Sequence, residues 1–197
     1  MIIYLVGISC VGKTTIGKML AKHIGFTFLD IDMEVEKHYL KSIERIQYEG
    51  FTMNGFRKKA SVVLDDILTN ADNLVIAGTP SGLKYSYLQV YKRHKTQKDL
   101  FSIHIRDSHE NVLKRLTFYD KDSKPIMEEL DETKKKRYLM EIKADYNYFK
   151  DSYKRADLQI DIENIKLDNI PNIIMNELHK MNRMPAANRV DGSAGVN

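Results

Sequence analysis

Short apolar runs alternate with longer amphipathic segments along the chain. Runs of four or five mostly apolar residues, bounded by polar residues or glycine, are typical of buried strands. Apolar residues that recur every three or four positions are typical of helices that bury one side. The pattern predicts strands at residues 2–6, 26–29, 74–77, 101–105 and 158–162. It predicts helices at residues 15–24, 33–48, 56–68, 83–94, 110–118, 130–153 and 170–181.

This alternation predicts an α/β fold. Parallel strands need long crossover connections, which are usually helices, so we expect a five-stranded parallel sheet with helices on both faces. Ligands of such sheets bind outside the carboxyl ends of the strands. Residues 1–182 are expected to form one domain. Residues 183–197 show no apolar periodicity, and we expect them to be a disordered tail.

Composition and charge narrow the class of protein. No apolar run approaches the roughly 18–20 residues that a membrane-spanning helix needs, and residues 1–6 lack the basic start of a secretory signal. The single cysteine, Cys10, excludes an internal disulfide and fits a cytoplasmic protein. The net charge is +4, and the dense basic run 134–137 follows acidic residues, as expected of a solvated helix. We therefore expect no nucleic-acid and no membrane partner.

The most informative motif occupies residues 7–14, Gly-Ile-Ser-Cys-Val-Gly-Lys-Thr, between the first predicted strand and the first predicted helix. It matches the phosphate-binding loop, or P-loop, G-x-x-x-x-G-K-[ST], in the structural context that the motif requires. Glycines let the backbone N–H groups point inward toward phosphate, and the helix N-terminus adds partial positive charge. Lys13 can reach the β- and γ-phosphates, and the Thr14 hydroxyl can ligate Mg²⁺. The motif predicts ATP and Mg²⁺ as ligands. The residues expected at the nucleotide are Gly7, Ser9, Val11, Gly12, Lys13, Thr14 and Thr15.

Two carboxylates, Asp30 and Asp32, follow the second predicted strand. Alternation along a strand would direct both toward one cleft. One could then hold a metal-bound water, and the other could accept a proton from an attacking hydroxyl. The alternative is that one of them is the N-cap of the helix that follows.

The N-terminal third of the chain resembles shikimate kinase. The similarity covers roughly residues 2–68 and includes the phosphate-binding loop, Phe-Leu-Asp-Ile-Asp at 28–32 and Gly-Phe-Arg at 55–57. The resemblance implies a small P-loop kinase of the nucleoside-monophosphate-kinase type, with a mobile lid at about residues 118–133. It further implies phosphoryl transfer to an alcohol group of a small, anionic acceptor, by a monomer or weak dimer.

The resemblance also implies roles for individual residues. Thr14 would bind Mg²⁺ directly and Asp30 through water, while Asp32 would bind the acceptor and act as the base. Arg57 would pair with the carboxylate of the acceptor, a task that suits its planar, bidentate guanidinium. The alternative for Arg57 is an ordinary surface ion pair. Gly78, after the third strand, would lie against the acceptor.

On the nucleotide side, the resemblance places two cations. Arg115 matches the family's arginine near the adenine. Lys124 occupies the place of the lid arginine, where a cation would stabilise transition-state charge. The alternative for Lys124 is an exposed loop lysine.

The chain departs from the family pattern in the half that binds the acceptor. Shikimate kinases carry Gly-Gly-Gly after the third strand, whereas this chain has Gly-Thr-Pro-Ser-Gly at 78–82. Pro80 has no N–H to donate. The family also has an arginine before the last strand, and the matching stretch 145–150 has none. Three hypotheses follow: a kinase that acts on shikimate, a P-loop kinase for another acceptor such as a sugar acid or a nucleotide, and a non-catalytic ATP-binding regulatory module.

Overall fold

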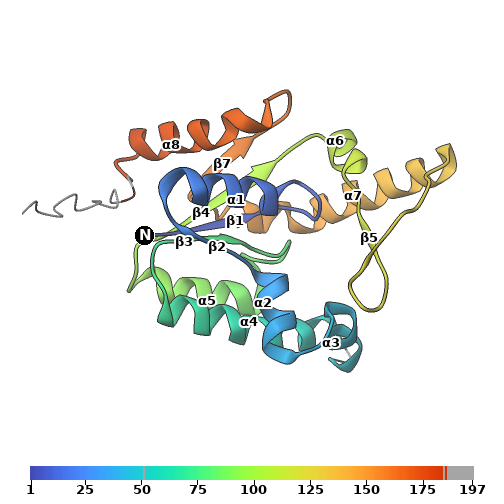
Figure 1. Ribbon diagram of the computed structural model, residues 1–197, viewed down its shortest axis with the longest axis horizontal. Coiled ribbons are helices and arrows are strands. Elements are labelled where there is room, and N and C mark those ends of the chain that lie inside the picture. Colours follow the sequence, from blue (N-terminus) through green and yellow to red (C-terminus); the bar gives the residue numbers. More distant parts are fainter. Residues whose placement is uncertain (51, 184, 186–197) are drawn as a thin grey trace, which may run out of the picture.

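The computed structural model of the chain describes residues 1–50, 52–183 and 185. Its centre is a sheet of five parallel strands in the order β2-β3-β1-β4-β7 (Figure 1). The strands are β1 (Ile2–Val6), β2 (Thr27–Asp30), β3 (Leu74–Ala77), β4 (Leu100–Arg106) and β7 (Leu158–Asp161). The predicted α/β class and all five predicted strands are confirmed. Because β1, β2 and β3 are neighbours and parallel, the phosphate-binding loop, Asp30 and Gly78 follow strands that end at one edge of the sheet.

Helices cover both faces of the sheet, as predicted. Helices α1 (Lys13–Ile24) and α8 (Ile170–Lys180) lie on one face, and α4 (Met53–Asn70) and α5 (Tyr85–Lys95) lie on the other (Figure 1). Strand β1 lies at the centre of this sandwich and is completely buried. Its continuous apolar sequence reflects burial on both faces, which is the rule for parallel sheets.

The prediction of a single helix at 33–48 is wrong, because the segment forms two helices, α2 (Ile31–Tyr39) and α3 (Ile43–Glu49). Leu40 ends α2 in the left-handed conformation, with φ of 53°. Ser42 then caps α3, since its hydroxyl accepts a hydrogen bond from the Arg45 amide. The apolar positions Tyr39 and Ile43 both pack against the core and keep helical spacing across the break. The apolar periodicity alone therefore predicted one continuous helix and gave no sign of the N-cap at Ser42.

The prediction of a helix at 110–118 is also wrong for the second half of that segment. Helix α6 spans His109–Lys114, and Phe118–Tyr119 is instead strand β5, which pairs antiparallel with β6 (Pro125–Ile126). The ring of Phe118 packs on that of Tyr138, with centroids 5.2 Å apart. Tyr138 belongs to the long helix α7 (Glu132–Tyr153), so tertiary packing decides the conformation of Phe118.

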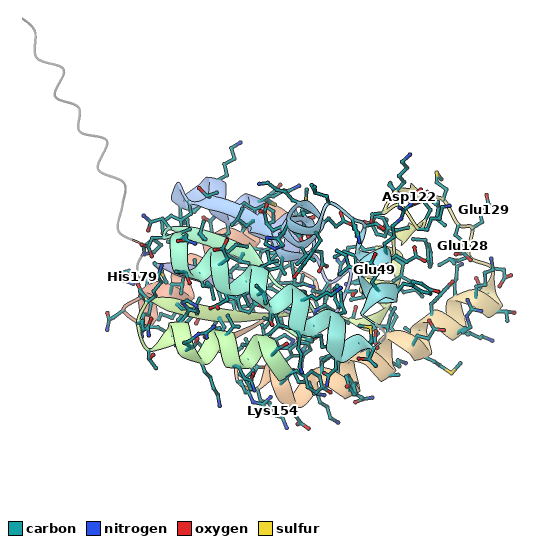
Figure 2. All side chains as sticks on the ribbon, turned by 90° about the horizontal axis from the view of Figure 1, so that it is seen from below. Glu49, Asp122, Glu128, Glu129, Lys154 and His179 are labelled. Atoms are coloured by element: carbon teal, nitrogen blue, oxygen red, sulfur yellow. The ribbon has the colours of Figure 1, made fainter. Side chains whose placement is uncertain are left out.

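The β5–β6 hairpin and the start of α7 form one end of the molecule. Figure 2 shows Asp122, Glu128 and Glu129 together at that end, while His179 of α8 lies at the opposite end. None of the helices in the described part of the chain is long and apolar enough to cross a membrane. The tail expected at 183–197 lies outside the described residues, apart from positions 183 and 185.

Candidate active site

The phosphate-binding loop depends on glycine at two positions. Gly7 has φ of 152°, and a Cβ there would lie 2.6 Å from the carbonyl oxygen of Ile105. Gly12, the N-cap of α1, has φ of 108°. Side chains are strained in this region of backbone space, and at Gly7 there is no room for one. The Lys13 ammonium curls over the loop and donates hydrogen bonds to the carbonyls of Gly7 (3.0 Å) and Ile8 (2.9 Å).

The remaining loop candidates differ in exposure. Ser9 and Thr15 are exposed beside the loop, whereas Val11 is buried in the core. Only the backbone of Val11 can therefore face a nucleotide.

Thr14 and Asp30 are brought together. The Thr14 hydroxyl donates a 2.7 Å hydrogen bond to Oδ2 of Asp30. The other oxygen of Asp30 accepts a 3.1 Å hydrogen bond from the Asp32 amide, so Asp30 is the N-cap of α2. Asp32 therefore lies in the first turn of a helix, and its predicted position along a strand is wrong. The helix begins one residue after the strand ends. The cap and the hydrogen bond to Thr14 use different oxygens of Asp30, so capping does not engage Oδ2.

Asp32 has an unusual protonation equilibrium. The residue is exposed to solvent, yet protein atoms lie on most sides of its carboxylate. Loss of hydration, and then repulsion by Asp30, raises the pKa of Asp32 to about 6. Burial lowers the pKa of Lys13, and the charge of Asp32 opposes that shift. These mutual effects place the carboxylate of Asp32 within electrostatic reach of the phosphate-binding lysine.

Arg57, on α4, lies on the same side of the sheet as Asp32. Both residues influence the buried hydroxyl of Tyr87, whose pKa is raised well above its usual range by burial and then by the charge of Asp32. The Arg57 guanidinium packs on the ring of Tyr85, 4.8 Å from its centroid, and its Nε is buried without a hydrogen-bond partner. Within the described residues Arg57 forms no ion pair, which contradicts the alternative that it is an ordinary surface ion-pair residue.

Gly78 packs closely against the side chain of Tyr4. A Cβ at position 78 would lie 2.7 Å from the Tyr4 ring, and one at Gly82 would lie 2.6 Å from the Tyr4 hydroxyl. The Gly78 amide donates a 2.8 Å hydrogen bond to the Leu5 carbonyl. This N–H is therefore engaged inside the fold, which leaves only the Cα side of Gly78 for contact with an acceptor.

Arg115 contacts the phosphate-binding loop directly. Its Nε donates to the carbonyl of Cys10 at 3.2 Å, and its Nη2 lies 2.5 Å from Oδ2 of Asp107. The side chain of Asp107 is almost completely buried. Sequence reasoning missed Asp107, although its place directly after β4, at the edge that carries the other site residues, was a usable signal.

The hairpin that contains Lys124 docks on α2 and α3. The Ser42 hydroxyl donates to the Lys121 carbonyl at 2.7 Å, and Arg45 pairs with Asp122 at 2.7 Å. The Ser123 hydroxyl donates to Glu36 of α2. Lys124 itself is exposed, and its hydrogen bonds in the described part of the chain are made by its backbone groups, with Asp120 of the same hairpin.

The chain is similar to shikimate kinases over almost its whole length. The family model for shikimate kinase matches residues 9–175. The shikimate kinase of Flavobacterium psychrophilum is 28% identical over 91% of this chain and 97% of its own length. That of Persephonella marina is 31% identical over 82% of this chain and 88% of its own. The crystal structure of the shikimate kinase of Aquifex aeolicus, 27% identical, superposes with a TM-score of 0.69 and covers 92% of this chain and 98% of that one.

A phosphate-binding loop on a five-stranded parallel sheet, with a carboxylate at the end of β2 that is hydrogen-bonded to the threonine of the loop, defines a P-loop kinase. Such enzymes are phosphotransferases, and here the group that accepts the phosphoryl group is an alcohol. The chain belongs to the shikimate kinase family.

Proposed function

We propose that this kinase transfers the γ-phosphoryl group of ATP to a hydroxyl of shikimate. One observation carries the choice of a hydroxylated carboxylate as acceptor. Asp32 lies in the first turn of α2 and Arg57 lies on α4, and the two helices are joined by the 3.1 Å hydrogen bond from the Tyr39 hydroxyl to the Lys59 carbonyl. A potential base and an arginine without an ion pair in the described chain thus lie on adjacent helices, and the charges of both act on the buried Tyr87 hydroxyl. A hydroxyl next to Asp32 and a carboxylate next to Arg57 would match this pair. The relatives named shikimate kinase support the same acceptor.

The residues near the loop fit a magnesium ion. Mg²⁺ prefers oxygen ligands and is usually held by only one or two protein groups, the rest being water and phosphate. Thr14 and Asp30 offer a hydroxyl and a carboxylate oxygen 2.7 Å apart. We therefore assign Thr14 as a direct ligand and Asp30 as a ligand through water. When bound, Mg²⁺ neutralises charge on the β- and γ-phosphates.

The chain's own residues would supply positioning and charge. Lys13 turns from the loop carbonyls to the phosphates, and the loop N–H groups surround them. Asp32 accepts the proton of the attacking hydroxyl, and its pKa of about 6 leaves it ionised at neutral pH. Arg57 fixes the acceptor through its carboxylate, while Arg115 lies on the nucleotide side of the loop. Residues 118–133 act as a lid that excludes water, with Lys124 turned toward the phosphates when the lid closes.

A second candidate is a different hydroxy acid, such as a sugar acid. The observation in its favour is the segment 78–82, where Thr79 and Ser81 are buried and share a 3.3 Å hydroxyl contact. Pro80 between them offers no N–H. A loop with these side chains presents a different surface from three consecutive glycines.

A coupled ADP-release assay separates these candidates. The full chain with ATP and Mg²⁺ is tested against shikimate, other hydroxy acids, neutral sugars and nucleosides, and without acceptor. We expect shikimate to stimulate ADP release most strongly. Stimulation by another hydroxy acid alone would favour the second candidate. Release that no acceptor stimulates would contradict both.

A further inference from the structure

A second cation, Lys84, contacts the same aromatic ring as Arg57 and lies on the segment that links Gly82 to α5. The Lys84 ammonium is 4.9 Å from the centroid of the Tyr85 ring, whose centroid is also 4.8 Å from the Arg57 guanidinium. It is 3.7 Å from the centroid of Tyr148 and 5.7 Å from that of Phe149, both on α7. Three elements, α4, the start of α5 and α7, thus converge on one cluster of rings and cations.

This cluster contains positive charge without a carboxylate. In the part of the chain that the structure describes, neither Arg57 nor Lys84 takes part in an ion pair. Lys84 donates a 3.3 Å hydrogen bond to the Tyr148 carbonyl and another to the Tyr85 side chain, which are neutral partners. The Nε of Arg57 is buried with no partner. Aromatic faces attract cations but leave their N–H groups without full hydrogen-bond partners. An anion that reached both cations would supply those partners.

The backbone at the centre of the cluster is strained. Tyr85 has φ of +54°, a conformation that aromatic residues seldom adopt. Its hydroxyl is hydrogen-bonded to that of Tyr148, while its ring contacts Arg57. Side-chain contacts therefore hold a conformation that costs free energy, as is found most often at functional sites.

The cluster adjoins the acceptor side of the active site. Lys84 follows the loop 78–82 at the end of β3, and β3 is hydrogen-bonded to β2, which ends at Asp30. Tyr87 comes two residues after Tyr85 in the same helix, and the charges of both Asp32 and Arg57 act on its hydroxyl. Asp32, Arg57 and Lys84 thus belong to α2, α4 and the start of α5, and α4 packs against both other helices.

We propose that Lys84 is a specificity-determining residue that binds the carboxylate of the acceptor together with Arg57. The inference rests on the proposed function and names the second cation of that site. It accounts for the stretch 145–150, which has no arginine but contributes Tyr148, the residue whose ring and carbonyl orient Lys84. A carboxylate between two cations is preferred to a neutral group, because each charged hydrogen bond is stronger than a neutral one.

The test compares shikimate with its methyl ester, which keeps the hydroxyls and removes the negative charge. Lys84→Met keeps the apolar stem and loses the ammonium group. We expect this variant to raise the KM for shikimate about 10-fold, the effect of one charged hydrogen bond, and to leave the KM for ATP within about twofold. Its preference for the acid over the ester should fall by a similar factor. Lys84→Arg should retain most of the preference.

Lys18→Met is the matched control, because Lys18 is also a lysine over an aromatic ring, 5.9 Å from the centroid of Phe28, on the exposed side of α1. It should change neither KM. If wild-type enzyme phosphorylates shikimate and Lys84→Met keeps the wild-type preference for the acid, this inference is overturned and the proposed function stands. A fall in turnover of acid and ester alike, with an unchanged preference, would also overturn it, since Lys84 would then only support the packing. If neither compound stimulates ADP release by the wild type, the proposed function fails, and the inference fails with it.

Discussion

The Thr14 hydroxyl and the Asp30 carboxylate are joined by a 2.7 Å hydrogen bond that ties the first turn of α1 to the end of β2. The same carboxylate caps α2 through its other oxygen. Asp30 therefore has two separable tasks, one at the proposed metal site and one in helix α2, and suitable substitutions distinguish them.

Asp30→Asn should remove the first task and keep the second. Asparagine is as good an N-cap as aspartate but carries no charge for a metal-bound water. We expect unchanged thermal stability and a higher Mg²⁺ concentration for half-maximal activity. Asp30→Ala should also lose about 1 kcal/mol of stability. Asp131→Ala removes the N-cap of α7 and serves as the control, with lower stability and an unaltered Mg²⁺ requirement. An Asn variant with wild-type Mg²⁺ dependence would limit Asp30 to capping.

Lys13→Ala should lose at least about 100-fold in turnover, because one preorganised cation at a developing charge contributes on this scale. The variant should stay folded, since burial disfavours the charge of Lys13 and its only hydrogen bonds within the described chain are to two loop carbonyls. ADP release and thermal melting measure the two effects. Lys18→Ala, on the same helix, is the control. Wild-type turnover in Lys13→Ala would show that the loop does not bind the transferred phosphate.

Asp32→Asn should lower kcat by about 10²-fold or more, the usual contribution of a general base, with little change in the KM for ATP. In the wild type, kcat/KM for the acceptor should fall as the pH drops below about 6, because protonated Asp32 cannot accept a proton. The variant should lose this acidic limb. A variant that kept both the rate and the pH profile would remove Asp32 from the chemistry.

The same pKa predicts how Asp32 affects stability. Folded Asp32 titrates near pH 6, above the value of about 3.9 that an aspartate has in an unfolded chain. Between these values the folded state retains a proton that the unfolded state has lost, so this residue's contribution to stability falls as the pH rises from about 4 to 6. The melting temperature of Asp32→Asn minus that of the wild type should therefore increase over this range. Solvent screens part of the effect, because Asp32 is exposed. A constant difference from pH 4 to pH 7 would contradict the prediction.

Arg57→Ala should raise the KM for shikimate by about 10-fold or more while the KM for ATP stays close to that of the wild type, because Arg57 is proposed to contact only the acceptor. Kinetics with each substrate varied in turn measure both constants. Arg93→Ala is the control, since Arg93 pairs with Asp65 on the exposed side of α5. Equal increases in both KM values would assign Arg57 a structural role instead.

Short sequence motifs were sufficient to predict part of the structure of this molecule. The strand, loop and helix that bind phosphate could be predicted because the motif, the glycines and the apolar run lie within some twenty consecutive residues. The orientation of Asp32 could not, because alternation along a strand applies only as far as the strand extends, and α2 begins at Ile31. The contact of Glu36 with Ser123 joins residues far apart in the chain, and no local pattern indicates it. Lys84 was missed for the same reason, since its partner Tyr148 lies on α7.

Tyr4 has a consequence for protein engineering. Because its ring and hydroxyl fill the space where side chains at 78 and 82 would begin, both glycines are fixed by a residue of the first strand. Between them, Thr79 and Ser81 are buried and Pro80 is half-buried, so a library that aims to change acceptor choice through this loop has most freedom at position 80 and needs small residues at 79 and 81. Replacing Tyr4 by a smaller residue would relieve the closest contact at 82, but a Cβ at 78 would still lie 2.9 Å from the Leu5 carbonyl oxygen, so position 78 has to stay glycine.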